Sequence, residues 1–202
     1  MIKIAIATLL MLGMSTGAHA GNPQAGEEKS AACQGCHGVD GNSPTGIWPS
    51  LAGQKPQYLV QQLLDFQSGA RKNETMEPMA AGLSKEDMED IAAYFAKQKV
   101  VPAGSDADAK LISRGMHIYK AGNIETNLAA CAGCHGPDAK GNGPAKFPAL
   151  AGQQAEYIVA QFDSFKHSTR SNDMNGMMRD IAARISEDDL AAVAAYLANL
   201  GK

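Results

Sequence analysis

One short pattern occurs twice in this chain and uses all of its cysteines. The stretch AACQGCHG covers residues 31–38, and AACAGCHG covers residues 129–136. Each stretch separates two cysteines by two residues and places a histidine directly after the second one. The cysteines concerned are Cys33, Cys36, Cys131 and Cys134. Any fold proposed for this chain must therefore present the same cluster of sulfur and nitrogen atoms twice.

The similarity between the two halves extends well beyond the cysteines. WPSLAGQKPQYLVQQLLDF (residues 48–66) aligns without a gap with FPALAGQQAEYIVAQFDSF (residues 147–165), and GLSKEDMEDIAAYFAKQ aligns with RISEDDLAAVAAYLANL. Such self-similarity indicates two units of one fold. Between them, VVPAGSDAD contains several turn-forming residues and is predicted to be a linker. We therefore expect an N-terminal domain at residues 21–99, a linker at 100–108 and a C-terminal domain at 109–202.

Apolar residues recur at helical spacing in both copies, and no segment alternates as a strand would. Helices are expected before the cysteines, near residues 25–32 and 110–120, and again over residues 58–66 and 157–165. A last helix should begin after Ser84 or Ser186, since each is a suitable N-cap followed by acidic residues. A Gly/Pro-rich loop is expected after each histidine, and a polar, methionine-bearing loop before each last helix. The predicted fold class is all-α.

The first twenty residues are typical of a secretory signal. A single lysine precedes the apolar stretch IAIATLLML, and TGAHA ends in the small-x-small pattern read by signal peptidase. Cleavage is expected after Ala20, so the mature chain would be exported. The whole chain has a net charge of −3, which gives no basic surface for nucleic acid.

Several kinds of site contain closely spaced cysteines. A zinc site normally takes its second pair of ligands from a separate segment. A thioredoxin-like redox pair belongs in a βαβ context, which this chain lacks, and a disulfide across two residues would close too small a loop to constrain the chain. The remaining interpretation is covalent haem, with two thioethers to the cysteines and the adjacent histidine on the iron. We therefore predict two haem c groups, with His37 and His135 as the proximal iron ligands.

The sixth ligand of each iron decides between an electron carrier and an enzyme with an open position. Met76 precedes Leu83 by the same spacing as Met178 precedes Ile185, the equivalent residue, so we predict that Met76 and Met178 are the axial pair. Met79 corresponds to Ile181, which cannot bind iron. The other polar or sulfur-bearing candidates are interpreted as packing or surface residues; they are Met79, Met177, His117 and His167. Met174, which lies in a three-residue insertion of the second copy, is the alternative ligand there.

These features resemble class I cytochromes c, and the tandem form is similar to the dihaem cytochrome c4 family of bacterial periplasms. The stretches that carry the resemblance include CQGCHGVDGNSP, WPSLAGQ, YLVQQLLDF and RKNETMEPMAAGLS, with their second-copy equivalents. The family's methionine ligands fall on Met76 and Met178. The resemblance also implies that the carbonyls of Pro49 and Pro148 accept a hydrogen bond from the ligand histidines, which fixes the ring.

The resemblance implies single-electron transfer in a respiratory chain, without bond chemistry. The expected partners are redox proteins, namely a respiratory-chain donor and a terminal oxidase or other acceptor. Two alternatives remain open at this point: a cytochrome subunit that serves a dehydrogenase, and a dihaem peroxidase, which is disfavoured because both copies supply a methionine. The sequence also leaves open whether the protein associates peripherally with a membrane.

Overall fold

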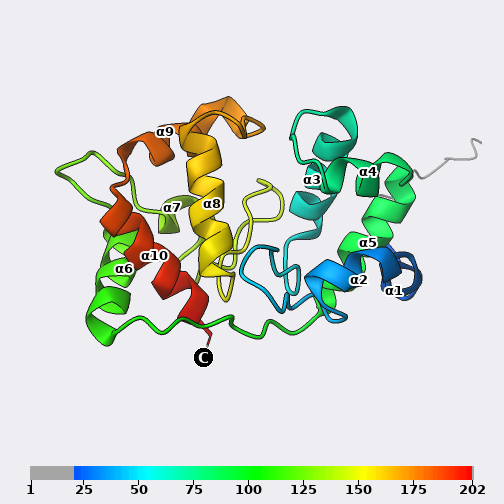
Figure 1. The fold of residues 1–202 in the computed structure, drawn as a ribbon, viewed down its shortest axis with the longest axis horizontal. Coiled ribbons are helices and arrows are strands. Elements are labelled where there is room, and N and C mark those ends of the chain that lie inside the picture. Colours follow the sequence, from blue (N-terminus) through cyan, green and yellow to red (C-terminus); the bar gives the residue numbers. More distant parts are fainter. Residues whose placement is uncertain (1–20, 202) are drawn as a thin grey trace, which may run out of the picture.

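The computed structural model describes residues 21–201, so the predicted signal, residues 1–20, lies outside the described residues. The N-terminal half contains α1 (Pro23–Lys29), α2 (Ala31–His37), α3 (Pro56–Ser68), α4 (Met76–Ala81) and α5 (Lys85–Lys97). The C-terminal half contains α6 (Ala109–Ala121), α7 (Ala132–His135), α8 (Ala155–Lys166), η1 (Met174–Gly176), α9 (Met177–Arg184) and α10 (Glu187–Asn199). Figure 1 shows the two halves side by side. Over residues 21–201 β pairing is limited to two isolated bridges, which confirms the all-α fold.

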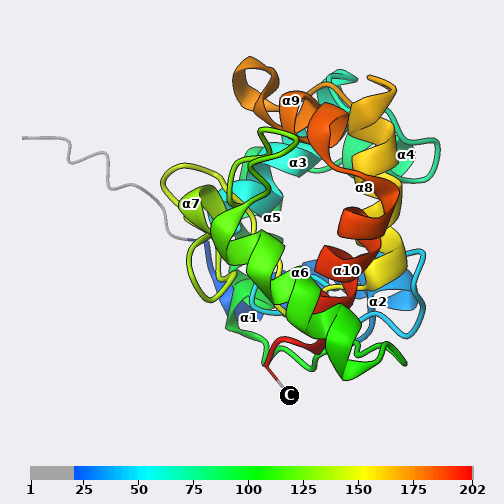
Figure 2. The same ribbon diagram turned by 90° about the vertical axis from the view of Figure 1, so that its left-hand side faces the viewer.

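In each half the first and last helices cross closely, α1 on α5 and α6 on α10. Figure 2 shows the crossing of α6 and α10. A glycine makes each crossing possible. A Cβ atom placed on Gly26 would lie 2.0 Å from the backbone oxygen of Asp90, and one on Gly115 would lie 1.9 Å from that of Ala192. These distances are far shorter than van der Waals contact, so the two crossings require residues without a side chain.

The last helix of each half begins at the predicted N-cap. The side chain of Ser84 accepts a hydrogen bond from the backbone N–H of Asp87, and the Asp87 carboxylate accepts one from the backbone N–H of Ser84, which forms a capping box. Ser186 accepts a bond from the backbone N–H of Asp189 in the same way. Each cap satisfies a helix-terminal N–H that would otherwise lack a partner.

Two expectations about local structure need correction. The helix expected over residues 25–32 is interrupted at Ser30, which ends α1 and precedes α2. The loops expected around the predicted methionine ligands each contain a short helix, α4 or α9. Side-chain capping explains the first of these helices, since Asn73 Oδ1 accepts bonds from the backbone N–H groups of Thr75 and Met76. A helix of six residues is too short to show a clear apolar period.

Each half has its own apolar core. In the N-terminal half the core lies where α3 meets α5, and Met88 is fully buried. In the C-terminal half it lies between α6, α8 and α10, with Tyr119 fully buried and Val193 and Leu197 1% exposed. Two separate cores are what a duplicated domain requires, since each unit must bury its own helix faces.

The segment between α5 and α6 has no helix and runs along one edge of the molecule (Figure 1). It is hydrogen-bonded to both halves: Val101 donates its backbone N–H to Asn42 Oδ1 at 2.8 Å, and Gly104 donates to the carbonyl of Ala198 at 2.8 Å. The connection is thus held against the surface. No helix within residues 21–201 has the length and apolar character needed to cross a membrane.

Candidate haem sites

His37 is held in a fixed orientation at the end of α2. Its side chain is buried, and its Nδ1 atom lies 2.8 Å from the carbonyl oxygen of Pro49. Because a carbonyl oxygen only accepts hydrogen bonds, Nδ1 must carry the proton in this contact. The neutral ring then has its lone pair on Nε2, which is the nitrogen left to bind a metal.

His135 repeats this arrangement at the end of α7. It is also buried, and its Nδ1 atom lies 2.9 Å from the carbonyl oxygen of Pro148. The expected role of both prolines as hydrogen-bond acceptors is therefore confirmed. Burial lowers the pKa of His37 and of His135, and the bond to the proline carbonyl opposes this effect only in part. Both rings are thus kept neutral, as a metal ligand must be.

The paired cysteines lie beside these histidines. Cys33 and Cys36 both lie on α2. They are three residues apart, so they share one face of the helix. In the second copy Cys131 immediately precedes α7 and Cys134 lies within it. None of these four cysteines is paired in a disulfide. Burial raises the pKa of Cys33 and raises that of Cys131 to about 11.

A zinc site would need further ligands close to each pair of cysteines. Over residues 21–201, no three His, Cys, Asp or Glu side chains converge into a metal cluster. A pair of thiols beside a neutral histidine, with Nε2 unprotonated, fits a haem attached through two thioethers and bound at its iron by the ring.

The predicted methionine ligands lie near the starts of the two short helices. Met76 is the first residue of α4 and Met178 is the second residue of α9. Both are partly buried, whereas Met79 is 39% exposed and Met177 is 38% exposed. Met174, the alternative in the second copy, is 56% exposed. This difference agrees with the choice made from the repeat, and the ligand role of Met76 and Met178 stays a prediction.

The spare histidines lie where they were expected. His117 on α6 and His167 at the end of α8 are both exposed. His167 Nδ1 lies 3.1 Å from a carboxylate oxygen of Asp163, one helical turn earlier. Their predicted surface positions are confirmed.

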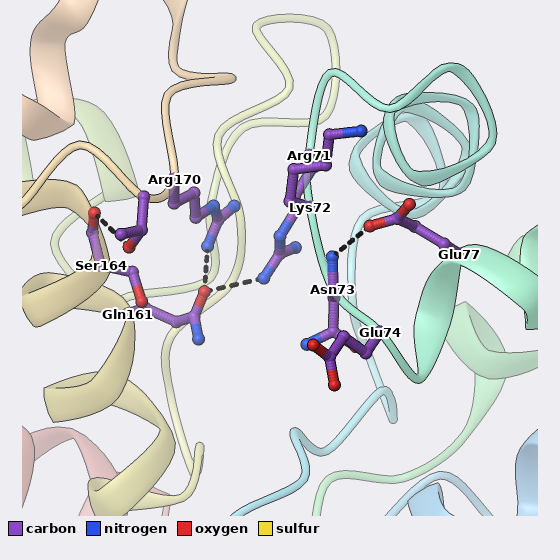
Figure 3. A pocket seen from close by; sticks show the side chains of 9 residues that line it. Arg71, Lys72, Asn73, Glu74, Glu77, Gln161, Ser164 and Arg170 are labelled. Carbon is purple, nitrogen blue, oxygen red and sulfur yellow. Dashed lines mark hydrogen bonds between the residues drawn. The ribbon is translucent and has the colours of Figure 1, made fainter.

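A polar cluster between the two halves was not identified from the sequence. It consists of three pairs of equivalent residues, which come from α3, α8 and the loops that follow them: Tyr58 and Tyr157, Gln62 and Gln161, Arg71 and Arg170. A cleft of about 430 Å³ adjoins this cluster (Figure 3). The sequence did contain a signal for this cluster. In each of the three pairs the residue type is the same in both copies, although polar surface residues diverge easily.

A second set of contacts between the halves shows the same symmetry. Gln153 accepts a bond from the backbone N–H of Ser50 at 2.8 Å and donates one to its carbonyl at 2.9 Å. Gln54, the equivalent residue, accepts from the N–H of Ala149 at 2.7 Å and donates to its carbonyl at 2.9 Å. Each half thus bonds to the other through the same residue, as in a two-fold interface.

The comparisons with known proteins agree with this geometry. The cytochrome c family matches residues 24–99 and 112–201. Cytochrome c4 of Thiocapsa roseopersicina is 48% identical over 184 residues, which cover 90% of this chain and 94% of that protein. The thiosulfate dehydrogenase electron acceptor of Stutzerimonas stutzeri is 42% identical, covering 85% of this chain and 80% of that protein. The crystal structure of reduced recombinant cytochrome c4 from Pseudomonas stutzeri superposes with a TM-score of 0.84 at 41% identity, covering 90% of this chain and all of that one.

Proposed function

The chain belongs to the cytochrome c4 family of dihaem electron carriers, and on this basis we propose that it carries single electrons in a periplasmic respiratory chain to a terminal oxidase. As a member of this family it holds two covalently bound haem c groups and is an electron carrier, not an enzyme.

We propose that Cys33 and Cys36 attach the first haem and that Cys131 and Cys134 attach the second. His37 and His135 would be the proximal ligands. The observation that carries this assignment is the bond from Nδ1 of each histidine to a proline carbonyl, which leaves Nε2 as the metal-binding atom in both copies. Such a bond fixes the ring and increases its donor strength.

Met76 and Met178 are proposed as the sixth ligands. The haem iron supplies one-electron chemistry, and a methionine ligand favours the ferrous state and raises the potential. The protein residues contribute position and protection from water. The two histidines are only 7% and 8% exposed, so the surrounding residues shield the proposed ligand atoms from water.

We further propose that residues 1–20 direct export and are removed, and that residues 21–99 and 109–202 form the two haem domains on either side of a linker at 100–108. Export would place the chain in the periplasm. The linker's hydrogen bonds to both halves support a fixed spacing of the domains, since the connecting segment does not hang free.

A second candidate partner has specific support. One of the similar proteins is named a thiosulfate dehydrogenase electron acceptor, which favours a dehydrogenase as the electron donor. The two proposals are compatible if a dehydrogenase reduces the protein and an oxidase reoxidises it. Stopped-flow mixing of the reduced holoprotein with oxidase-containing membranes, and of the oxidised holoprotein with a thiosulfate dehydrogenase, separates them. Failure of the first reaction under conditions where a cytochrome c control is oxidised would contradict the oxidase route.

The ligand assignment is tested by paired methionine substitutions. Met76→Ala should remove half of the methionine-to-iron absorption band of the oxidised holoprotein and lower the potential of one haem, whereas Met79→Ala should leave both unchanged. Met178→Ala and Met177→Ala form the matching pair in the second copy. Loss of the band in a Met79 or Met177 variant, with the band intact in Met76→Ala or Met178→Ala, would show that the assignment is wrong.

A further inference from the structure

One peptide group in the N-terminal half is hydrogen-bonded from both sides. It is the peptide between Pro49 and Ser50. Its carbonyl oxygen lies 2.8 Å from Nδ1 of His37 and accepts the proton on that nitrogen. Its N–H group donates to Oε1 of Gln153 at 2.8 Å. His37 belongs to the same half as this peptide and Gln153 belongs to the other, so a single amide group connects the histidine of one half to a side chain of the opposite half.

The second copy contains the same arrangement with the halves exchanged. The carbonyl of Pro148 lies 2.9 Å from Nδ1 of His135, and the N–H of the same peptide, which belongs to Ala149, donates to Oε1 of Gln54 at 2.7 Å. Each glutamine ends the stretch that begins with the proline of its own half, PSLAGQ or PALAGQ. Each half therefore holds its own histidine with a proline carbonyl and supports the histidine of the other half with a glutamine.

The glutamine side chains are fixed in orientation. Gln153 is 7% exposed and Gln54 is 6% exposed. Oε1 of Gln153 also accepts from the backbone N–H of Gln154 at 2.9 Å, while its Nε2 donates to the carbonyl of Ser50 at 2.9 Å. Gln54 makes the equivalent bonds. Because two N–H groups converge on one end of each amide and a carbonyl faces the other end, the oxygen must be the atom that faces the peptide N–H.

A hydrogen bond at one side of a peptide group changes the strength of the bond at its other side. The amide is conjugated, so an N–H group that donates to an acceptor leaves more negative charge on the carbonyl oxygen of the same peptide. Such chains of bonds strengthen one another by perhaps 10–30% per bond. A stronger carbonyl acceptor draws the Nδ1 proton more closely and makes Nε2 of the imidazole a better electron donor to a metal. Gln153 thus acts on His37 without contact between the two side chains.

We propose that Gln153 and Gln54 are positioning residues, each of which sets the orientation and the donor strength of the ligand histidine in the opposite half. This inference rests on the proposed function, in which Nε2 of His37 and of His135 binds a haem iron. A better donor stabilises ferric iron more than ferrous iron. Each glutamine therefore lowers the potential of the haem in the other half, and the packing of the two halves is coupled to both potentials.

The test uses the reduced dihaem holoprotein, labelled with ¹⁵N at histidine, and three variants. Gln153→Met and Gln54→Met keep a side chain of similar length and remove its hydrogen bonds. Gln61→Met is the matched control, since Gln61 also accepts a bond across the interface, at 2.6 Å from Lys146 Nζ, and within residues 21–201 its other side-chain bond is to Asp65 rather than to a proline peptide.

Two quantities are measured for each histidine by nuclear magnetic resonance. The first is the chemical shift and the hydrogen-exchange rate of its Nδ1–H group, which report the strength of the bond to the proline carbonyl. The second is the midpoint potential of its haem, which is read from the loss of that histidine's signal as the sample is oxidised stepwise. Both quantities are thereby assigned to one half of the molecule.

We expect a crossed pattern. In Gln153→Met the Nδ1–H signal of His37 should move upfield and exchange at least about fivefold faster, because its bond is weaker. The ferric/ferrous equilibrium of that haem should change at least about twofold toward the ferrous state, which is roughly 18 mV at about 59 mV per tenfold for one electron. His135 and its haem should be unchanged. Gln54→Met should give the reverse pattern, and Gln61→Met should leave both halves as in the wild type.

The proposal is overturned if neither histidine responds, if each variant affects the histidine of its own half instead, or if Gln61→Met has an equal effect. The ligand assignment is judged separately in the wild type, where an axial histidine carries the large upfield shift of its ring protons that a porphyrin ring current imposes. Without that shift at His37 and His135 the proposed function is wrong. With that shift present and both Nδ1–H signals unmoved in the methionine variants, only the present inference is wrong.

If a methionine variant does not fold, glutamate takes its place. Gln153→Glu and Gln54→Glu keep an acceptor oxygen for the peptide N–H, and a carboxylate is a stronger acceptor than an amide. The Nδ1–H signal of the opposite histidine should then move downfield and the potential of its haem should fall. An unchanged signal and potential would overturn the proposal.

Discussion

The crossing of α1 and α5 predicts a large loss of stability from one methyl group. In Gly26→Ala the new Cβ would lie 2.0 Å from the backbone oxygen of Asp90 and 2.9 Å from the Cβ of Tyr94. The nearest atom belongs to the backbone, so rotation of a side chain cannot relieve the clash. The two helices would have to move apart by roughly 1 Å, and overpacking of this kind typically costs about 1–3 kcal/mol, occasionally more.

We expect Gly26→Ala to fall at the upper end of this range, at about 3 kcal/mol, because the clash is with backbone atoms. For a domain of this size 1 kcal/mol corresponds to roughly 4–8 °C in Tm, so the first domain should melt about 12–24 °C lower. The assay is calorimetric melting of the holoprotein, together with urea unfolding followed by circular dichroism. Gly115→Ala should have the same effect on the second domain, since its Cβ would lie 1.9 Å from the Ala192 oxygen.

Gly82→Ala is the matched control. Gly82 ends α4 with a negative φ, and a Cβ atom there would have no neighbour within 4 Å. Alanine should therefore be neutral or stabilise the protein by about 0.4–1 kcal/mol through the unfolded state. If Gly26→Ala unfolds within about 0.5 kcal/mol of the wild type, a magnitude typical of uninvolved surface sites, then α1 and α5 are not packed as closely as the structure places them.

Three further predictions concern the interface, acid stability and the cofactor. Gln153→Ala leaves the buried N–H of Ser50 without its partner, so urea unfolding should show a loss of about 1–3 kcal/mol. The exposed Gln24→Ala should show no change, and equal midpoints for the two variants would contradict the contact. Hydrogen bonds from Lys29 and Ser84 lower the pKa of Asp87 from 3.8 to about 2. The stability that this group contributes is therefore present above about pH 4 and is lost as the pH falls toward about 2. Asp87→Asn should flatten the acid limb of a plot of stability against pH, and an unchanged limb would refute this. Residues 21–202 produced without haem attachment should be unfolded by circular dichroism, because aromatic residues make up only 5% of the chain and each small core depends on the haem; a cooperatively melting apoprotein would contradict it.

Much of the fold was predictable because its determinants are local. The helix at residues 58–66 was found from apolar spacing and extends only a few residues further at each end in α3. Ser84 could be identified as an N-cap because the acidic residue that completes its capping box lies only three positions later. The histidine and cysteine pattern was equally local, since the ligand and both attachment points lie within one short segment.

The interface was not predictable in the same way. Arg71 and Gln161 are ninety positions apart in the sequence and meet only because two folded units pack together. Nothing in the neighbourhood of Arg71 distinguishes a buried interfacial arginine from a surface one, since arginine is usually exposed. Only the identity of the equivalent residues in the two copies carried information, and it became meaningful once the structure placed them opposite each other.

The three-residue insertion of the second copy explains why the two methionine segments are built differently. In the first copy Asn73 caps the start of α4, and its Oδ1 accepts from the backbone N–H of Met76. In the second copy the equivalent Asn172 lies further from α9 and is released from this role. Its amide donates to Gln62 and Asp65 across the interface instead.

Asp173 takes over the local role in the second copy, where its carboxylate accepts from both the backbone and the side chain of Arg179, one residue after Met178. The same asparagine therefore supports a proposed iron ligand in one copy and the contact between domains in the other. The same substitution is expected to act differently at Asn73 and at Asn172. At Asn73 it affects the start of the helix that carries Met76, and at Asn172 it affects the polar cluster between the halves. The duplicated sequence thus keeps its symmetry at the interface, where both halves need the same partners, and departs from it at the methionines, where the inserted residues change which side chain can reach the helix.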